Sequence, residues 1–190
     1  MTLFFIIAAY MAGSVNFAII LLLLLGKEDP RKTFSGNAGT TNVYRQAGML
    51  WAAVVLILDV GRALAIGAAA LYFLDTSLVP WVGLALIIGN RYPCFHGFRG
   101  GKGVASYLGF GAALSPISSM LSCIVWVILF SIIRIPFIAS FFMTATIAIG
   151  TILTFSREPA AITGVLATAL LIFYNHKTNI EALREKVTGG

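Results

Sequence analysis

Long apolar runs, separated by short polar segments, divide this 190-residue chain. Four runs, at residues 3–25, 49–73, 117–133 and 137–155, are close to the roughly 20 residues that cross a bilayer as a helix. Three runs are shorter, at residues 79–89, 104–114 and 160–173. The pattern predicts an all-α integral membrane protein, a single domain over residues 1–190 with seven transmembrane helices, some of them short. Five crossings plus a re-entrant pair are the alternative, because short segments buried in protein can enter a bilayer without crossing it.

Composition excludes a soluble globule. Hydrophobic residues make up 59% of the chain and charged residues 11%, with a mean hydropathy of +0.94, which leaves too little polar surface to cover a domain of this size. The first apolar run lacks a basic region before it and a small-residue cleavage site, so we expect a retained helix and not a signal peptide. The two cysteines, Cys94 and Cys123, indicate neither a disulfide framework nor a multi-cysteine metal site.

The basic residues fall on one side of the predicted membrane. A net charge of +6 would suggest nucleic acid as a partner of a soluble protein. Here, eleven of the 13 Lys and Arg residues lie in the loops of one side, against Arg157 on the other side and Arg62 within a span. The positive-inside rule then places the N-terminus outside and the C-terminus in the cytoplasm. Three polar, motif-bearing segments, at residues 33–45, 89–106 and 174–184, share the cytoplasmic face.

The first of these segments is rich in hydrogen-bonding side chains on a flexible backbone. Gly36 and Gly39 let the chain approach a ligand closely, and Arg45 offers a planar cationic fork suited to phosphate. Hydroxyl and amide groups come from Ser35, Asn37, Thr40, Thr41 and Asn42. Such residues also cap helices, which is the alternative interpretation. We favour a binding site because one cap would not use so many donors.

The second segment contains a glycine-rich turn with a lysine. Gly100, Gly101 and Gly103 would allow successive N–H groups to converge on an anion, and Lys102 adds a point charge. The helix expected from Val104 directs the positive end of its dipole to the same place. This is not a P-loop, because glycine stands at position 103 where Ser or Thr would bind magnesium. The alternative is an interfacial loop whose basic residues touch lipid head groups.

The third segment and the second apolar run hold the remaining candidates. His176 and Asn179 are three residues apart, so on a helix they share one face. His176 and Glu181 also match a His-x-x-x-x-acid spacing that occurs in acyltransferases, although a solvated tail is the alternative. Asp59 and Arg62 would be costly in a membrane if unpaired, so we expect them to neutralise one another and to pack inward.

Missing features narrow the chemistry. The cytoplasmic segments contain no cluster of aspartates or histidines that would hold a metal, and no Gly-x-Ser-x-Gly nucleophile elbow is present. The expected reaction therefore depends on positioning and electrostatic stabilisation, with neither a metal nor a cofactor.

Three stretches of this chain resemble the bacterial PlsY family. They are the Ser-Gly-Asn-Ala-Gly-Thr-Thr-Asn-Val-Tyr-Arg run at 35–45, the Gly-Gly-Lys-Gly-Val-Ala run at 100–105, and the His-Lys-Thr-Asn-Ile run at 176–180. The resemblance covers nearly the whole chain and includes Asp29 and Asp59. One departure is Asn90, where the family leads us to expect a histidine. The family comprises seven-span acyl-phosphate-dependent glycerol-3-phosphate acyltransferases of the bacterial cytoplasmic (inner) membrane.

The resemblance implies a reaction and a set of site residues. A fatty acyl group would pass from acyl phosphate to the 1-hydroxyl of glycerol 3-phosphate, giving lysophosphatidic acid and phosphate without a covalent acyl-enzyme. The partners would be these two substrates and membrane lipids, with no nucleic acid and no protein partner predicted. Catalytic roles fall to Ser35, Arg45, Lys102, His176 and Asn179, and substrate-binding roles to Asn37, Thr41, Asn42, Gly100, Gly101 and Gly103. A transporter or lipid-binding protein that recognises organic phosphates is the alternative.

Overall fold

The computed structural model describes residues 1–188, the side chains of 186 and 187 excepted, and these residues form helices joined by short loops. In chain order the helices are α1 (Thr2–Ser14), α2 (Phe17–Leu24), α3 (Thr40–Ala47), α4 (Met49–Phe73), α5 (Val79–Arg91), η1 (Cys94–His96), α6 (Val104–Leu114), α7 (Pro116–Ile133), α8 (Pro136–Thr154), α9 (Pro159–Tyr174) and α10 (Lys177–Thr188). The predicted all-α class is confirmed, and each of the seven apolar runs is helical.

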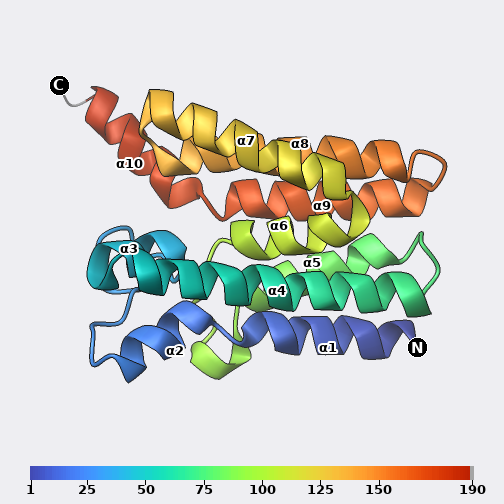
Figure 1. Cartoon of the computed structure of the whole chain (residues 1–190), viewed down its shortest axis with the longest axis horizontal. Coiled ribbons are helices and arrows are strands. Elements are labelled where there is room, and N and C mark those ends of the chain that lie inside the picture. The colour runs from blue at the N-terminus through green and yellow to red at the C-terminus, as the bar shows by residue number, and fades with distance from the viewer. Residues whose placement is uncertain (189–190) are drawn as a thin grey trace.

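Most of these helices lie side by side along one axis. Figure 1 shows α1 and α4 on one side of the molecule, α7 and α8 on the other, and α6 between them. The main packing pairs are α1 with α5, α4 with α6, α7 with α8 and α5 with α9. Helix α1 begins at one end of this bundle, and α10 lies at the opposite end (Figure 1).

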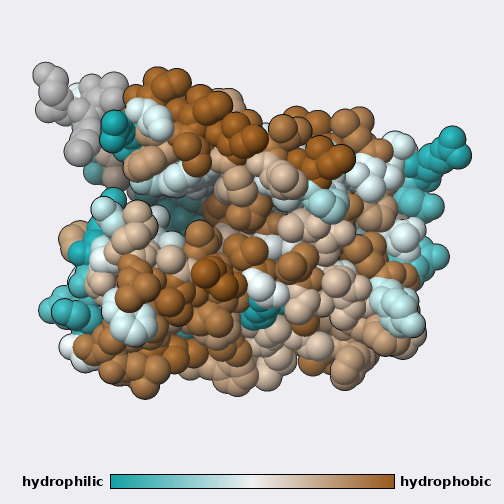
Figure 2. Space-filling view, viewed as in Figure 1, coloured by the Kyte–Doolittle hydropathy of each residue, from teal (hydrophilic) through white to brown (hydrophobic). Residues whose placement is uncertain are grey.

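The outer surface is apolar along the middle of the bundle. Figure 2 shows hydrophobic residues over this middle and hydrophilic residues gathered at the two ends. Four spans are long and apolar enough to cross a membrane, Thr2–Leu24, Met49–Phe73, Pro116–Ile133 and Pro136–Thr154, and a fifth results if α9 and the start of α10 form one bent span. The chain is therefore a multi-pass membrane protein, while the count of seven crossings stays a prediction.

Small residues allow the inner helices to approach closely. A Cβ atom at Gly13 or Gly89 would collide with the backbone of the facing helix, so α1 and α5 touch backbone to backbone. Gly109 of α6 lies in the same way against the carbonyl of Val60 in α4. Close approach of this kind is typical of helix pairs in membranes. There the hydrophobic driving force between helices is absent, and small side chains allow the van der Waals packing that holds the helices together. It fixes the positions of the short helices α5 and α6, which carry the second motif segment between them.

The first span is broken, which the apolar pattern did not predict. Asn16 begins α2 by accepting a hydrogen bond from the N–H of Ile19 at 3.0 Å, and its own side-chain N–H donates to the Ala38 carbonyl at 3.2 Å. The break frees the carbonyl of Val15, which accepts a hydrogen bond from Arg62. A buried amide thus ties the first helix to the first motif segment.

Candidate active site

A cavity of about 470 Å³ brings the three motif segments together. It lies at the end of the bundle that carries α3 and α10, where Figure 2 shows a recess with hydrophilic walls. Nine of the predicted site residues line it: Ser35, Asn37, Thr41, Arg45, Gly101, Lys102, Gly103, His176 and Asn179. Asn42 and Gly100 are not among its lining residues. The segments are distant in sequence, so their meeting at one cavity is a property of the fold.

Asn42 shapes the first segment and does not face the cavity. Its side chain is fully buried, and its amide donates to the carbonyls of Pro30 at 2.9 Å and Thr33 at 3.1 Å. Its oxygen accepts the Ser35 hydroxyl at 3.2 Å. Asn42 therefore holds the loop before α3 and orients Ser35, which does line the cavity. The structure thus supports a positioning role for Asn42, and its predicted contact with substrate stays a prediction.

The first segment still offers free groups to a ligand. Asn37 and Thr40 each have a buried side-chain oxygen with no hydrogen-bond partner in the described part of the chain. Arg45 lies over the ring of Phe34, with its guanidinium carbon 5.6 Å from the ring centre. Among the described residues no carboxylate forms an ion pair with Arg45. Buried polar groups without partners are costly, so these oxygens are suited to a ligand that carries hydroxyl groups, because the Asn37 oxygen can only accept, while Arg45 is suited to an anion.

The glycine amides of the second segment are used within the protein. The N–H of Gly100 donates to the Arg91 carbonyl at 3.0 Å, and that of Gly101 to the Asn90 carbonyl at 2.9 Å. Both carbonyls lie at the C-terminal end of α5, where a helix leaves carbonyls without internal partners. These two N–H groups are therefore not free to form the predicted cradle in this structure, and the substrate-binding role of Gly100 and Gly101 stays a prediction.

The first turn of α6 offers free backbone N–H groups to the cavity. Val104, Ala105 and Ser106 line the cavity, and the N–H groups of a first helical turn have no partner within the helix. Gly103 precedes them with φ +92°, a conformation that favours glycine. The expected positive end of the helix dipole is thus directed to the cavity, as the sequence indicated.

Lys102 connects the second segment to the third. Its side chain is buried, with 9% of it exposed, and its ammonium donates to the side-chain oxygen of Asn179. The buried amide of Asn175 donates to the Lys102 carbonyl at 3.3 Å. Burial, together with the charge of Arg91, lowers the pKa of Lys102 to about 8. Lys102 also has no carboxylate partner in the described region, so its charge is available to an anion.

His176 is neutral at pH 7 and has a defined tautomer. Its Nδ1 lies 2.8 Å from the carbonyl oxygen of Ile172, and because a carbonyl only accepts, Nδ1 carries the proton. The remaining nitrogen, Nε2, then holds a lone pair. Burial lowers the pKa of His176 to about 4, and the charges of Lys102 and Arg91 act in the same direction. Glu181, at the spacing of an acid partner, is exposed on α10 and makes no ion pair with His176.

An ion pair supports the cavity from within the bundle, as the sequence predicted. Arg62 binds the carboxylate of Asp59 at 2.9 Å, and both side chains are about nine-tenths buried. The same guanidinium donates to the hydroxyl of Ser106 at 3.0 Å. Asp59 and Ser106 line the cavity. The pair therefore joins α4 to the first turn of α6.

Sequence reasoning missed the apolar wall of the cavity. It is formed by α4, α6, α7 and α8 and includes Leu56, Leu108, Trp126, Val127, Phe137 and Met143. Trp126 of α7 donates to the hydroxyl of Ser140 in α8 at 3.2 Å, which links the two helices at this wall. These residues belong to ordinary apolar runs, so no local motif marks them. Val127 of α7, which belongs to this wall, is 57% exposed, so the wall is open to a ligand at α7.

These features define a membrane enzyme class in which a polar, cationic cavity meets an apolar wall. A family model described as "Glycerol-3-phosphate acyltransferase" matches residues 3–186. The chain belongs to this family, which confirms the resemblance seen in the motifs.

Individual relatives agree along nearly the full length. A glycerol-3-phosphate acyltransferase of Methylobacillus flagellatus is 35% identical, with 98% of this chain and 95% of the relative covered. One from Neisseria meningitidis serogroup C is 36% identical, covering 96% and 94%.

Solved structures share the fold. The crystal structure of PlsY, an integral membrane glycerol 3-phosphate acyltransferase, in its glycerol 3-phosphate form has a TM-score of 0.89 at 32% identity, covering 99% of this chain and 92% of that one. Its lysophosphatidic acid form has a TM-score of 0.87 at 31% identity, with the same coverage.

Proposed function

We propose that this protein transfers a fatty acyl group from acyl phosphate to the 1-hydroxyl of sn-glycerol 3-phosphate, forming lysophosphatidic acid and phosphate. The observation that carries the proposal is the single cavity in which Arg45, Lys102 and the start of α6 face an apolar wall. Both substrates carry a phosphate, and one of them also carries a long acyl chain. The names of the relatives and the two ligand forms of the similar structure support the same reaction.

The cavity would bind the two phosphates through cations and free donors. Arg45 suits a phosphate because its planar fork donates two parallel hydrogen bonds. Lys102 would exchange its bond to Asn179 for one to a phosphate oxygen. The acyl chain would lie along the apolar wall, toward the membrane.

The proposed reaction needs no acyl-enzyme. The 1-hydroxyl oxygen attacks the acyl carbon of acyl phosphate, a new ester bond forms, and the bond to phosphate breaks with phosphate as the leaving group. Ser35 and Asn179 would orient the reacting groups, and Nε2 of His176 would accept the hydrogen bond of the hydroxyl. A pKa of about 4 makes His176 a weak proton acceptor. This favours a phosphate oxygen as the final acceptor of the proton.

We also propose the membrane arrangement that the charges predict. In it, seven helices cross the bacterial inner membrane, the N-terminus lies outside, and the cavity faces the cytoplasm. The support is the distribution of Lys and Arg, because the basic segments that contribute to the cavity fall on the predicted cytoplasmic side. Glycerol 3-phosphate would then enter from the cytoplasm.

The test is an assay of the purified protein with glycerol 3-phosphate and one acyl donor at a time. We expect lysophosphatidic acid with acyl phosphate and none with acyl-CoA or acyl carrier protein. Activity only with a thioester donor would overturn the assignment of the donor. Absence of product with every donor, together with uptake of an organic phosphate into proteoliposomes, would identify a transporter instead.

A further inference from the structure

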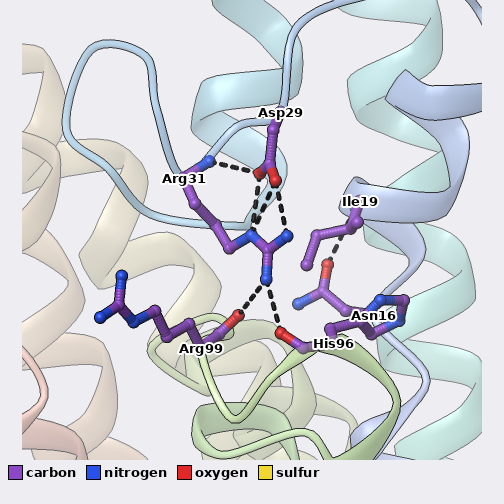
Figure 3. A network of polar contacts seen from close by, with 6 residues as sticks. All are labelled: Asn16, Ile19, Asp29, Arg31, His96 and Arg99. Atoms are coloured by element: carbon purple, nitrogen blue, oxygen red, sulfur yellow. Dashed lines mark hydrogen bonds and ion pairs between the residues drawn. The ribbon is translucent and has the colours of Figure 1, made fainter.

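Asp29 and Arg31, in the loop between α2 and α3, form a brace that reaches the second motif segment (Figure 3). The Asp29 carboxylate accepts hydrogen bonds from Arg31 Nε at 2.9 and 3.0 Å and from Arg31 Nη2 at 2.6 Å. It also accepts one from the Arg31 backbone N–H at 2.9 Å. The carboxylate thus fixes the guanidinium plane and leaves Nη1 directed away from Asp29.

Nη1 binds the tip of the second segment. It donates to the carbonyl oxygen of His96 at 2.5 Å and to that of Arg99 at 3.4 Å. Between these two carbonyls the chain turns through Gly97 and Phe98, whose φ angles of +64° and +56° lie in the left-handed region. A bulky residue with positive φ is an unusual backbone state that surrounding contacts must hold. Two carbonyls converging on one cation supply such a contact.

Other hydrogen bonds of this tip are local. The N–H groups of His96 and Phe98 both donate to the Pro93 carbonyl within the same segment. Among the described residues, Arg31 makes the hydrogen bonds that join the tip, residues 96–99, to a distant part of the chain. The brace therefore holds the tip against the loop at residues 29–31, which Asn42 of the first segment binds through the Pro30 carbonyl.

The two segments meet next to Lys102. A Cβ atom at Gly101 would lie 2.8 Å from the Ala38 carbonyl oxygen, so the backbones of the two segments are in close contact there. Ala38 precedes α3, which carries Arg45, and Gly101 precedes Lys102. A change in the angle between the segments would change the separation of these two cations. We propose that the Asp29–Arg31 brace is a positioning element for acyl transfer, which sets Lys102 relative to Arg45 by fixing the tip of the second segment.

The chemistry of the brace requires arginine. One planar group must bind a carboxylate along one edge and two carbonyls at another nitrogen, which the single ammonium of lysine does not reproduce. The brace is also close to neutral overall, because Asp29 offsets the charge of Arg31. Its effect on the reaction therefore comes from geometry and not from added attraction for anions.

The first experiment compares kinetics of purified variants, and its meaning rests on the proposed acyl transfer. We expect Arg31→Ala and Arg31→Lys each to lower kcat about tenfold or more, because a displacement of about 1 Å in a site costs up to 100-fold. Asp29→Asn should also lower kcat. In all three variants, KM for glycerol 3-phosphate should change less than kcat. Arg99→Ala is the matched control, because its side chain is exposed and points away from the brace while its carbonyl remains (Figure 3).

The second experiment reads the geometry without using activity. Spin labels at Lys32→Cys and Phe95→Cys, both exposed positions, would report the distance between the loop that carries Arg31 and the second segment in a protein whose natural cysteines are replaced. We expect a narrow distance distribution in the parent and in Arg99→Ala, and a broader or shifted one in Arg31→Ala and Arg31→Lys.

The outcomes separate the two proposals. Unchanged distances in both Arg31 variants, or full kcat in Arg31→Lys, would overturn the brace as a positioning element. Equal losses in Arg99→Ala and Arg31→Ala would overturn it too, because they would show a plain charge effect. A parent protein without acyltransferase activity would refute the proposed function, while the distance measurement would still decide whether the brace holds the segments.

Discussion

His176 shows how burial changes what a side chain can do. Its folded pKa of about 4 lies below the ordinary value of 6.5, so the folded protein binds fewer protons than the unfolded chain between these two values. Stability contributed by the neutral histidine is therefore complete above pH 6.5 and is lost as pH falls toward 4. Lowering the pH from 7 to 5 should cost about 2 kcal/mol of stability through this residue.

Thermal unfolding in detergent at pH 7 and pH 5 checks this expectation. His176→Gln keeps a hydrogen-bonding side chain of similar size but does not titrate in this range. It should lose less stability over the same interval than the parent protein. Equal losses in the two proteins would show that His176 is not the buried group that titrates.

Lys102 should give the reaction an upper pH limit. Because its pKa is about 8, the ammonium loses its proton as the pH rises through that value, and attraction for phosphate weakens. The limit should be seen in kcat/KM, which reports the free enzyme. Lys102→Arg stays charged, so the descending limb of its profile should move to higher pH, although geometry lowers its maximum rate. A limb that stays near pH 8 in Lys102→Arg would refute this role.

Removal of the Lys102 ammonium should be costly at any pH. Lys102→Ala should lower kcat/KM about 100-fold or more, since a charged donor in a water-poor site is worth several kcal/mol to a developing negative charge. Lys102→Met is the matched variant of Lys102→Ala, because methionine keeps an apolar stem of similar length and lacks the charge. Kinetics of Lys102→Met close to those of the parent for both substrates would contradict the assignment.

At the scale of elements, the two glycines Gly97 and Gly101 test the junction of the motif segments. A Cβ atom at Gly101 would lie 2.8 Å from both the Ala38 carbonyl oxygen and the Asn90 side-chain oxygen, whereas one at Gly97 would meet nothing within 4 Å. We expect Gly101→Ala to lower kcat/KM about tenfold or more by forcing the segments apart. Gly97→Ala should cost only about 1–2 kcal/mol of stability through its φ of +64°. Similar activities of the two variants in a steady-state assay would argue against a tight junction.

The sequence predicted the elements better than their contacts. Apolar runs of about 20 residues mark helices because a bilayer imposes that length, and the three polar segments marked the site. The break at Asn16 could not be predicted, because the side-chain amide of Asn16 binds the Ala38 carbonyl, which is distant in the sequence. The hydrogen bonds of Gly100 and Gly101 were hidden for a similar reason. The sequence does not show that their N–H groups donate to the last carbonyls of the short helix α5.

Some residues of the candidate site could be predicted from the sequence, and others could not. The sequence indicated Arg45, Lys102, His176 and Asn179 because each lies in a polar segment outside the apolar runs, and the structure brings all four to one cavity. Trp126 was not indicated, because aromatic residues in an apolar run are common and its bond to Ser140 depends on how α7 packs against α8. Polar residues of the site can be predicted from the sequence, whereas the apolar wall of the cavity and the Asp29–Arg31 brace depend on contacts that only the fold creates.

At the scale of the whole molecule, the charge distribution predicts which end of the bundle faces the cytoplasm. The ends are hydrophilic and the middle is apolar (Figure 2), so the bundle can sit across a bilayer in either direction. The bias of Lys and Arg between the two sides predicts one of these directions, with Arg157 outside and Lys177 inside. In a protein without its natural cysteines, Arg157→Cys should react with a membrane-impermeant maleimide in intact cells. Lys177→Cys should react only after permeabilisation, and the reverse pattern would turn the cavity, with its phosphate-binding cations, to the outside of the cell.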